Sequence, residues 1–118
     1  MIRFIIASLL LLPTAAVSQV ALDGTGGALR VLDKVTAEVH DLDLTIGESV
    51  KVGHLTVTLE ECRVPRLNPT GDAYAQVMIN YQDITDPIFR GWLIASAPAL
   101  HAMDHPRYDV WALRCKTS

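Results

Sequence analysis

The chain has 118 residues, half of them hydrophobic, and its 10 basic and 13 acidic residues give a net charge of −3. This length is enough for one domain and not for two. A mildly acidic chain without a lysine or arginine cluster excludes phosphate-driven binding of nucleic acid and counts against docking onto anionic lipid head groups.

Residues 1–18 have the layout of a cleavable secretory signal peptide. Arg3 provides the positive start, an apolar run follows over residues 4–12, and the small residues Ala16 and Ser18 precede the expected cleavage site. The run is too short to span a bilayer stably. We expect export to the periplasm, with cleavage after Ser18 or, as the second choice, after Ala16. No cysteine follows directly, so no lipid anchor is expected, and a retained membrane anchor is the alternative interpretation.

Strands dominate the elements predicted after the signal peptide. The glycine-rich residues 19–28 predict a flexible lead-in. Apolar and polar residues then alternate, which predicts strands over residues 35–46 and 50–59, joined by glycine-containing turns. Residues 65–72 carry the prolines, asparagine and glycine of a loop.

The last third of the chain predicts two further strands and a helix. Residues 73–81 alternate as a strand, and residues 91–95 are apolar on both faces, as expected of a central strand. Ser96 fits a helix N-cap, so a short helix is expected over residues 97–104. A final strand is expected over residues 108–115.

These elements predict a single all-β domain over residues 29–118. The expected architecture is a small twisted β-barrel or sandwich of about six or seven short strands with one short helix.

The two cysteines, Cys62 and Cys115, both follow the signal peptide. An exported domain with two cysteines usually pairs them. The closed loop would hold about 54 residues, for which chain entropy gives roughly 4 kcal/mol of stabilisation. A metal-binding or catalytic pair is the alternative, although neither cysteine lies in a C-x-x-C motif.

Two side-chain sets near the predicted helix could carry chemistry. His101, Asp104 and His105 could share a zinc ion, because side chains four apart on a helix face the same way. The helix is short and a third strong ligand is not evident, so we favour His105 as a cap of the helix end. Ser96 with Asp104 and either histidine could form a nucleophile–base set, but no G-x-S-x-G elbow surrounds it. We expect no catalytic residue, metal ion or cofactor.

Asp41, Asp43 and Glu48 could offer oxygen ligands to calcium. On a strand, however, Asp41 and Asp43 lie about 7 Å apart and lack the looped spacing of a calcium site. We interpret them as a solvated face that also protects a sheet edge.

Trp92, Tyr108 and Trp111 form the aromatic group of the last third of the chain. One interpretation is core packing. The other is a partly exposed platform for a protein partner or a sugar ring, because tryptophan and tyrosine dominate binding hot spots. The sequence leaves open which rings are exposed.

Three blocks of sequence resemble one exported proteobacterial family. They are residues 29–37 (LRVLDKVTA), 91–100 (GWLIASAPAL) and 105–115 (HPRYDVWALRC), and with Cys62 they make nearly all of the chain after the signal peptide similar to domain of unknown function 2155. At the position of His101 the family usually has a small residue, which weakens the paired-histidine zinc site. The family's genes often lie beside one for an accessory subunit of respiratory complex I. The resemblance therefore implies a protein partner at the outer face of the cytoplasmic membrane.

We therefore expect a non-catalytic periplasmic module that binds another protein, and the resemblance extends this to an accessory subunit of a respiratory membrane complex. Residues 91–111, with their three aromatic side chains, are the expected docking surface. The alternative is a binder of a cell-wall polymer or small ligand, in which Asp104 and Asp109 lie beside the rings. An enzyme would require His105 to converge with one of these carboxylates in a cleft.

Overall fold

The computed structural model describes residues 21–117, and the predicted signal peptide lies outside the described residues. Apolar and polar residues alternate through much of this part, and alternate side chains of a strand share a face. Eight strands form: β1 (Ala21–Asp23), β2 (Gly26–Asp33), β3 (Val39–Thr45), β4 (Ser49–Val52), β5 (Leu55–Pro65), β6 (Tyr74–Tyr81), β7 (Phe89–Ile94) and β8 (Tyr108–Lys116). The predicted all-β class is confirmed.

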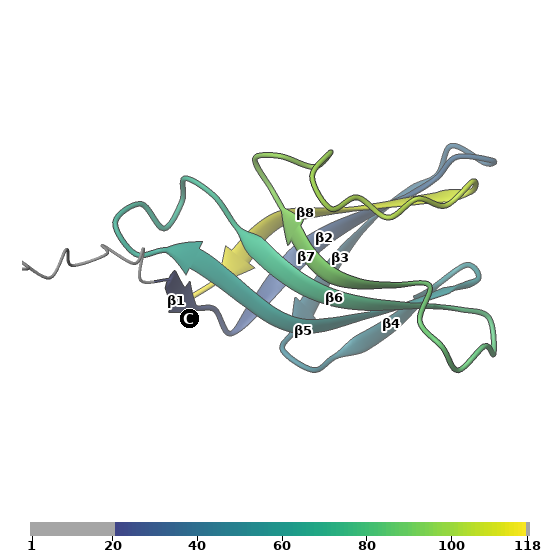
Figure 1. Cartoon of the computed structure of the whole chain (residues 1–118), viewed down its shortest axis with the longest axis horizontal. Coiled ribbons are helices and arrows are strands. Elements are labelled where there is room, and N and C mark those ends of the chain that lie inside the picture. Colours follow the sequence, from purple (N-terminus) through teal and green to yellow (C-terminus); the bar gives the residue numbers. More distant parts are fainter. Residues whose placement is uncertain (1–20, 118) are drawn as a thin grey trace, which may run out of the picture.

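The strands form two antiparallel sheets (Figure 1). The larger sheet has the order β1-β5-β6-β7, and β4 also pairs with β5. The smaller sheet has the order β3-β2-β8. β5 is the longest strand, and it pairs with β6 along one side and with β1 and β4 along the other.

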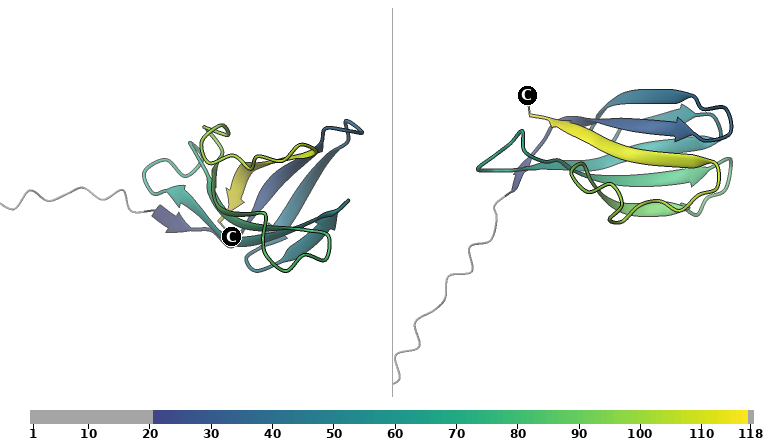
Figure 2. Two further views of the ribbon diagram at one scale, coloured as in Figure 1. Left: turned by 45° about the vertical axis from the view of Figure 1, so that its right-hand side comes forward. Right: turned by 90° about the horizontal axis from the view of Figure 1, so that it is seen from above.

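The hydrophobic core lies between the two sheets. Leu55, Val57 and Leu59 of β5 are fully buried, as are Leu29 and Val31 of β2. Each such side chain stabilises the fold by roughly 1.5–3 kcal/mol relative to an exposed position. The sheets lie close together near the C-terminus and diverge toward the opposite end (Figures 1 and 2). They share no strand within residues 21–117 and do not close, so the barrel, one of the two architectures expected from the sequence, is wrong.

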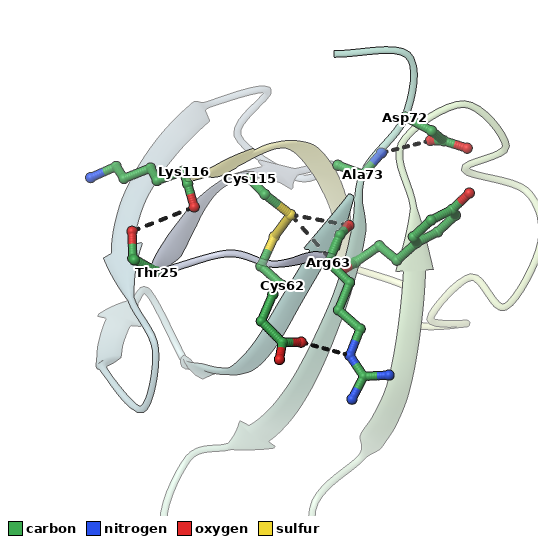
Figure 3. The surroundings of a disulfide bond; sticks show 9 residues. Thr25, Cys62, Arg63, Asp72, Ala73, Cys115 and Lys116 are labelled. Atoms are coloured by element: carbon green, nitrogen blue, oxygen red, sulfur yellow. Dashed lines mark hydrogen bonds and ion pairs between the residues drawn. A yellow bond between two sulfur atoms is a disulfide. The ribbon is translucent and has the colours of Figure 1, made fainter. Parts of the chain in front are cut away.

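Cys62 and Cys115 form the predicted disulfide, with their Cα atoms 5.7 Å apart (Figure 3). Cys62 lies in β5 and Cys115 in β8, so the bond joins the two sheets at the end where they lie close together. Cys62 is buried and belongs to the core.

Residues 21–23 and 26–28 belong to the sheets, which corrects the flexible lead-in predicted for residues 19–28. β1 pairs with β5, and residues 26–28 are buried in β2. Glycine is required here for close packing: a Cβ atom at Gly27 would lie 2.9 Å from Sγ of Cys62. Only residues 19 and 20 of the predicted lead-in lie outside the described part.

The strand predicted to start at residue 35 begins at Val39, because residues 34–38 form the turn between β2 and β3. The carboxylate of Asp33 accepts the backbone N–H groups of Val35 and Thr36 at 3.0 and 3.3 Å. Aspartate commonly stabilises a turn in this way, in competition with a continuing strand.

The central position predicted for residues 91–95 is also wrong. Among the described strands β7 pairs with β6 alone, so it forms a margin of the larger sheet. Leu93 points into the core, whereas the side chains of Trp92 and Ile94 are partly exposed on the outer face.

The short helix predicted over residues 97–104 is replaced by turns and an irregular segment. Ser96, the expected N-cap, donates its hydroxyl to the carboxylate of Asp72 at 2.6 Å instead. His101 has a φ of +54°, which a helix does not allow, and Met103 is buried in the core. Burial of Met103 anchors the segment as a loop. Within residues 21–117 no helix has the length and apolar character needed to cross a membrane.

Candidate functional site

The three aromatic residues emphasised by the sequence lie in three different places. Trp92 points outward from the larger sheet, because its neighbour Leu93 points into the core. Trp111 points outward from the smaller sheet, directly across from the half-buried Arg30. Tyr108 is fully buried between the sheets. The three rings therefore do not form one platform, and the predicted interaction role of Tyr108 is wrong.

A groove of about 330 Å³ lies beside Trp92 on the outer face of the larger sheet. Its lining comes from four strands and the loop after β7: Ala21, Arg63, Tyr74, Trp92, Ile94 and His101. Arg63, Tyr74 and Ile94 are direct cross-strand neighbours on β5, β6 and β7. The hydrogen-bonded sheet fixes the spacing of these side chains, so a partner would bind here without ordering most of the surface first.

Arg63 provides the charge of this groove. Its guanidinium carbon lies 5.3 Å from the ring centroid of Trp92, a cation–π contact. Asp23 and Glu61 form ion pairs with Arg63 at 3.2 and 3.3 Å, so two carboxylates lie beside the guanidinium. The groove therefore combines aromatic and apolar side chains with a cation and two carboxylates.

Trp111, on the opposite face of the molecule, lies next to ion pairs. Its neighbour Arg30 makes a bidentate contact with Asp41 at 2.8 and 3.0 Å. Hydrogen bonds from Arg30 lower the pKa of Asp41. Exposed pairs of this kind contribute little to stability. Trp111 does not line the groove beside Trp92, which makes it a useful comparison for Trp92.

Tyr108 fills the space where the two sheets diverge. Its ring neighbours that of His105, followed by Tyr81 and His54, with ring centroids 5.6, 5.2 and 5.9 Å apart in turn. The hydroxyl of Tyr108 accepts the backbone N–H of His54 at 3.2 Å. A Cβ atom at Gly53, which has a φ of +58°, would lie 2.6 Å from that hydroxyl. This series of rings links the two sheets and is part of the packing.

Asp33 and Arg107 form an ion pair beside Tyr108, at the end of the β2–β8 pairing. Arg107 Nη2 lies 3.0 Å from Asp33 Oδ2, and Nε lies 3.2 and 3.3 Å from the two oxygens. These hydrogen bonds lower the pKa of Asp33 to about 2, although burial of the carboxyl acts in the opposite direction. The backbone N–H groups of Val35 and Thr36 lower it further. Asp33 therefore holds the turn and the strand end together.

This low pKa predicts a loss of stability in acid. Because the pKa of Asp33 falls from 3.8 to about 2 on folding, its contribution is complete above pH 4 and is lost as the pH falls toward 2. We expect urea titrations to show a falling free energy of unfolding over that range. Asp33→Asn should have a lower free energy of unfolding than the unaltered chain at pH 7. It should lose less of that free energy on acidification. Asp41→Asn, which breaks an exposed pair, should lower the free energy of unfolding much less than Asp33→Asn does. Equal stability of Asp33→Asn and the unaltered chain at pH 7 would contradict the assignment.

A second cavity, of about 420 Å³, lies between the loop before β6, the end of β7 and β8. Asp72 lines it and accepts the backbone N–H groups of Ala73 and Ser96 at 2.8 and 3.0 Å, as well as the Ser96 hydroxyl. Burial raises the pKa of Asp72, but these hydrogen bonds outweigh it and lower the pKa overall. No histidine is among the described lining residues, so the structure does not assemble the nucleophile–base set considered for Ser96.

The candidate metal ligands are also separated. His101 lines the Trp92 groove, whereas Nδ1 of His105 accepts the backbone N–H groups of Arg107 and Tyr108 at 3.1 and 3.3 Å. His105 therefore orders the start of β8 and does not cap a helix. In the described part of the chain no three histidine, cysteine or acidic side chains gather as a metal site.

The carboxylates considered for calcium have other partners. Asp41 pairs with Arg30 and Asp43 with Lys116, while Glu48 accepts the backbone N–H of Thr45 at 3.3 Å. Asp41 and Asp43 lie on the outer face of β3, as the alternation predicted.

Sequence reasoning missed Arg63 and Tyr74 as members of the groove. Both alternate with buried residues, so their outward direction could have been predicted. Their position beside Trp92 depends on the pairing of three strands that are distant in sequence, for which the chain carries no local signal.

Comparisons with known proteins agree with the resemblance described above. The family described as "Uncharacterized protein conserved in bacteria (DUF2155)" matches residues 27–115, from the start of β2 into β8. "Uncharacterized protein RP359" of Rickettsia prowazekii is 32% identical over 95 residues, which cover 77% of this chain and 61% of that protein. The chain thus corresponds to less than two thirds of that relative's length. No solved structure matches. The match over most of the chain shows that it belongs to the bacterial DUF2155 family.

Proposed function

We propose that this protein is a non-catalytic, exported interaction module that binds another protein through the Trp92 groove. One observation carries the proposal: an apolar strand, β7, lies at a sheet margin and turns Trp92 and Ile94 toward a groove rather than toward a covering layer. Apolar side chains on an uncovered sheet face are characteristic of interaction surfaces. Arg63 and its two carboxylates supply the polar rim that such surfaces have.

The proposed compartment is the periplasm, with the signal peptide removed after export. The Cys62–Cys115 disulfide supports this location, because structural disulfides persist in oxidising compartments. The proposed partner is a membrane protein complex, and the resemblance noted from the sequence favours respiratory complex I. In this role the domain would be an accessory subunit on the periplasmic side.

The two tryptophans on opposite faces allow a matched test. A C-terminally tagged domain is incubated with gently solubilised native membranes, and co-eluting proteins are identified by mass spectrometry. We expect Trp92→Ala to weaken capture at least about 30-fold, as for a hot-spot residue, and Trp111→Ala to leave it unchanged. Circular dichroism must show that both variants are folded.

Two outcomes contradict the proposal. A clean monomer without a stoichiometric partner would oppose a role as accessory subunit. Equal capture by folded Trp92→Ala and the unaltered domain would show that the groove is not the docking surface.

A second candidate function is binding of a cell-wall polymer. The observation in its favour is the composition of the same groove, because tryptophan and tyrosine rings beside carboxylates and a guanidinium can stack on and hydrogen-bond a sugar. Pelleting of the domain with purified cell-wall sacculi, reduced in Trp92→Ala, would support it.

A further inference from the structure

β3 has one hydrogen-bonding edge that faces away from the rest of its sheet. The backbone N–H of Asp33 donates to the carbonyl of Glu38, and the backbone N–H of Ile46 donates to the carbonyl of Thr25. With the register of the two strands, these bonds determine which residues of β3 are hydrogen-bonded to β2. Even-numbered residues of β3 therefore bond to β2, and odd-numbered residues direct their N–H and C=O groups outward. The backbone groups of Val39, Asp41 and Asp43 have no hydrogen-bond partner among the described residues. β3 lies at the margin of the molecule (Figure 2).

This edge lacks most devices that prevent strand addition. β3 has seven residues, which is longer than a protected edge strand usually is, and contains neither proline nor lysine. Its pairing with β2 runs without a bulge from Gly26 to Leu32. Its acidic side chains, Asp41 and Asp43, are both exposed on its outer face.

The two faces of β3 define what an added strand would meet. On the inner face Leu42 packs against the core, so an apolar side chain next to it would extend the core. On the outer face lie Asp41 and Asp43. Their present partners, Arg30 and Lys116, belong to β2 and β8, away from the free edge. The side of each carboxylate that faces the edge can therefore accept another cation.

We propose that the free edge of β3 binds an extended segment of a partner polypeptide in which basic residues alternate with apolar ones. The segment adds as a fourth strand to the smaller sheet. Main-chain hydrogen bonds to Val39, Asp41 and Asp43 supply affinity, and alternate side chains supply specificity. This surface is separate from the Trp92 groove and does not depend on it.

A second copy of this chain fits the edge poorly. In antiparallel pairing of two β3 strands, the outward-directed residues must bond to one another. Thr45 already uses its backbone groups in the turn to Glu48. The register with the most hydrogen bonds therefore pairs Val39 with Asp43 and places the two copies of Asp41 opposite each other. Like charges directly opposite each other destabilise a sheet, so the carboxylates oppose self-association and favour a basic strand.

The probe is a seven-residue capped peptide in which lysine alternates with valine, and the control peptide has glutamate in place of lysine. Backbone amide exchange is measured by NMR on the domain with each peptide. We expect the lysine peptide to slow exchange of the Val39, Asp41 and Asp43 amides at least about tenfold at saturation, and the glutamate peptide to have no effect. Unchanged exchange at all three amides with the lysine peptide overturns the proposal, as does equal protection by both peptides.

Two variants separate the main chain from the charge. Asp41→Pro removes an N–H that faces solvent, a change that an edge strand tolerates. It should lower the affinity of the domain for the lysine peptide at least about tenfold. Asp41→Asn keeps the N–H and should weaken binding less, by about two- to fivefold, through lost charge. Trp92→Ala should bind the peptide normally, because its groove lies on the other sheet. Undiminished binding by folded Asp41→Pro contradicts the proposal, and if that variant does not fold, Asp43→Pro provides the same comparison.

Discussion

Replacing both Cys62 and Cys115 with alanine is expected to lower the free energy of unfolding by roughly 4 kcal/mol. The bond closes a loop with a sequence separation of 53 residues, and chain entropy assigns about that value to a loop of this size. A domain of about 100 residues has only about 5–15 kcal/mol of net stability. With a urea slope of about 1–3 kcal/mol per molar, the unfolding midpoint should fall by about 2 M.

Chemical reduction supplies the control for this prediction. A dithiol reductant should lower the urea midpoint of the unaltered domain to nearly that of the double variant, and should leave the double variant unchanged. A midpoint shift below about 0.5 M in the double variant would show that the fold does not depend on the bond. The bond joins β5 to β8 where the sheets lie close together, so its loss should release the C-terminal strand first.

Alternation in the sequence was sufficient to predict most strands and their buried positions. In β5, Leu55, Val57 and Leu59 are buried and the residues between them are partly exposed, in the predicted phase. This works because a slip of one residue would move every apolar side chain to the wrong face. The disulfide was predictable from the cysteine count and the expected export.

Side-chain hydrogen bonds explain two of the places where the sequence-based prediction failed. Val35 continues the apolar pattern but is 72% exposed, because the Asp33 side chain holds the following residues in a turn. Ser96 failed as a helix cap for a similar reason, since Asp72 occupies its hydroxyl. Asp72 lies 24 positions earlier in the chain, so no local pattern indicates the contact.

The candidate site was only partly predictable. The sequence indicates Trp92 as a possible interaction residue. The apolar pattern of residues 91–95 is ambiguous, because it is expected of a central strand and also of a marginal strand with a docking face. The sheet order distinguishes the two by placing β7 at a margin. The cross-strand row of Arg63, Tyr74 and Ile94 then turns a single tryptophan into a groove.

Tyr108→Ala is expected to lower the free energy of unfolding by about 3–5 kcal/mol, the range for loss of a fully buried aromatic ring. The ring of Tyr108 lies where the sheets diverge, against His105 and under the guanidinium of Arg107 at 5.3 Å. Its removal leaves a cavity that neither sheet can fill without moving. Urea unfolding followed by circular dichroism should show a midpoint about 2 M lower, or no folded state at all.

Tyr108→Phe is the matched variant, because it keeps the ring and removes only the hydroxyl. The N–H of His54 then loses its acceptor, which should lower the free energy of unfolding by about 1 kcal/mol. A buried ring cannot contact a partner, so Tyr108→Phe should retain the partner capture that Trp92→Ala loses. Loss of capture by a fully stable Tyr108→Phe would place this residue back on the docking surface. Retained capture would separate the packing role of Tyr108 from the binding role of Trp92.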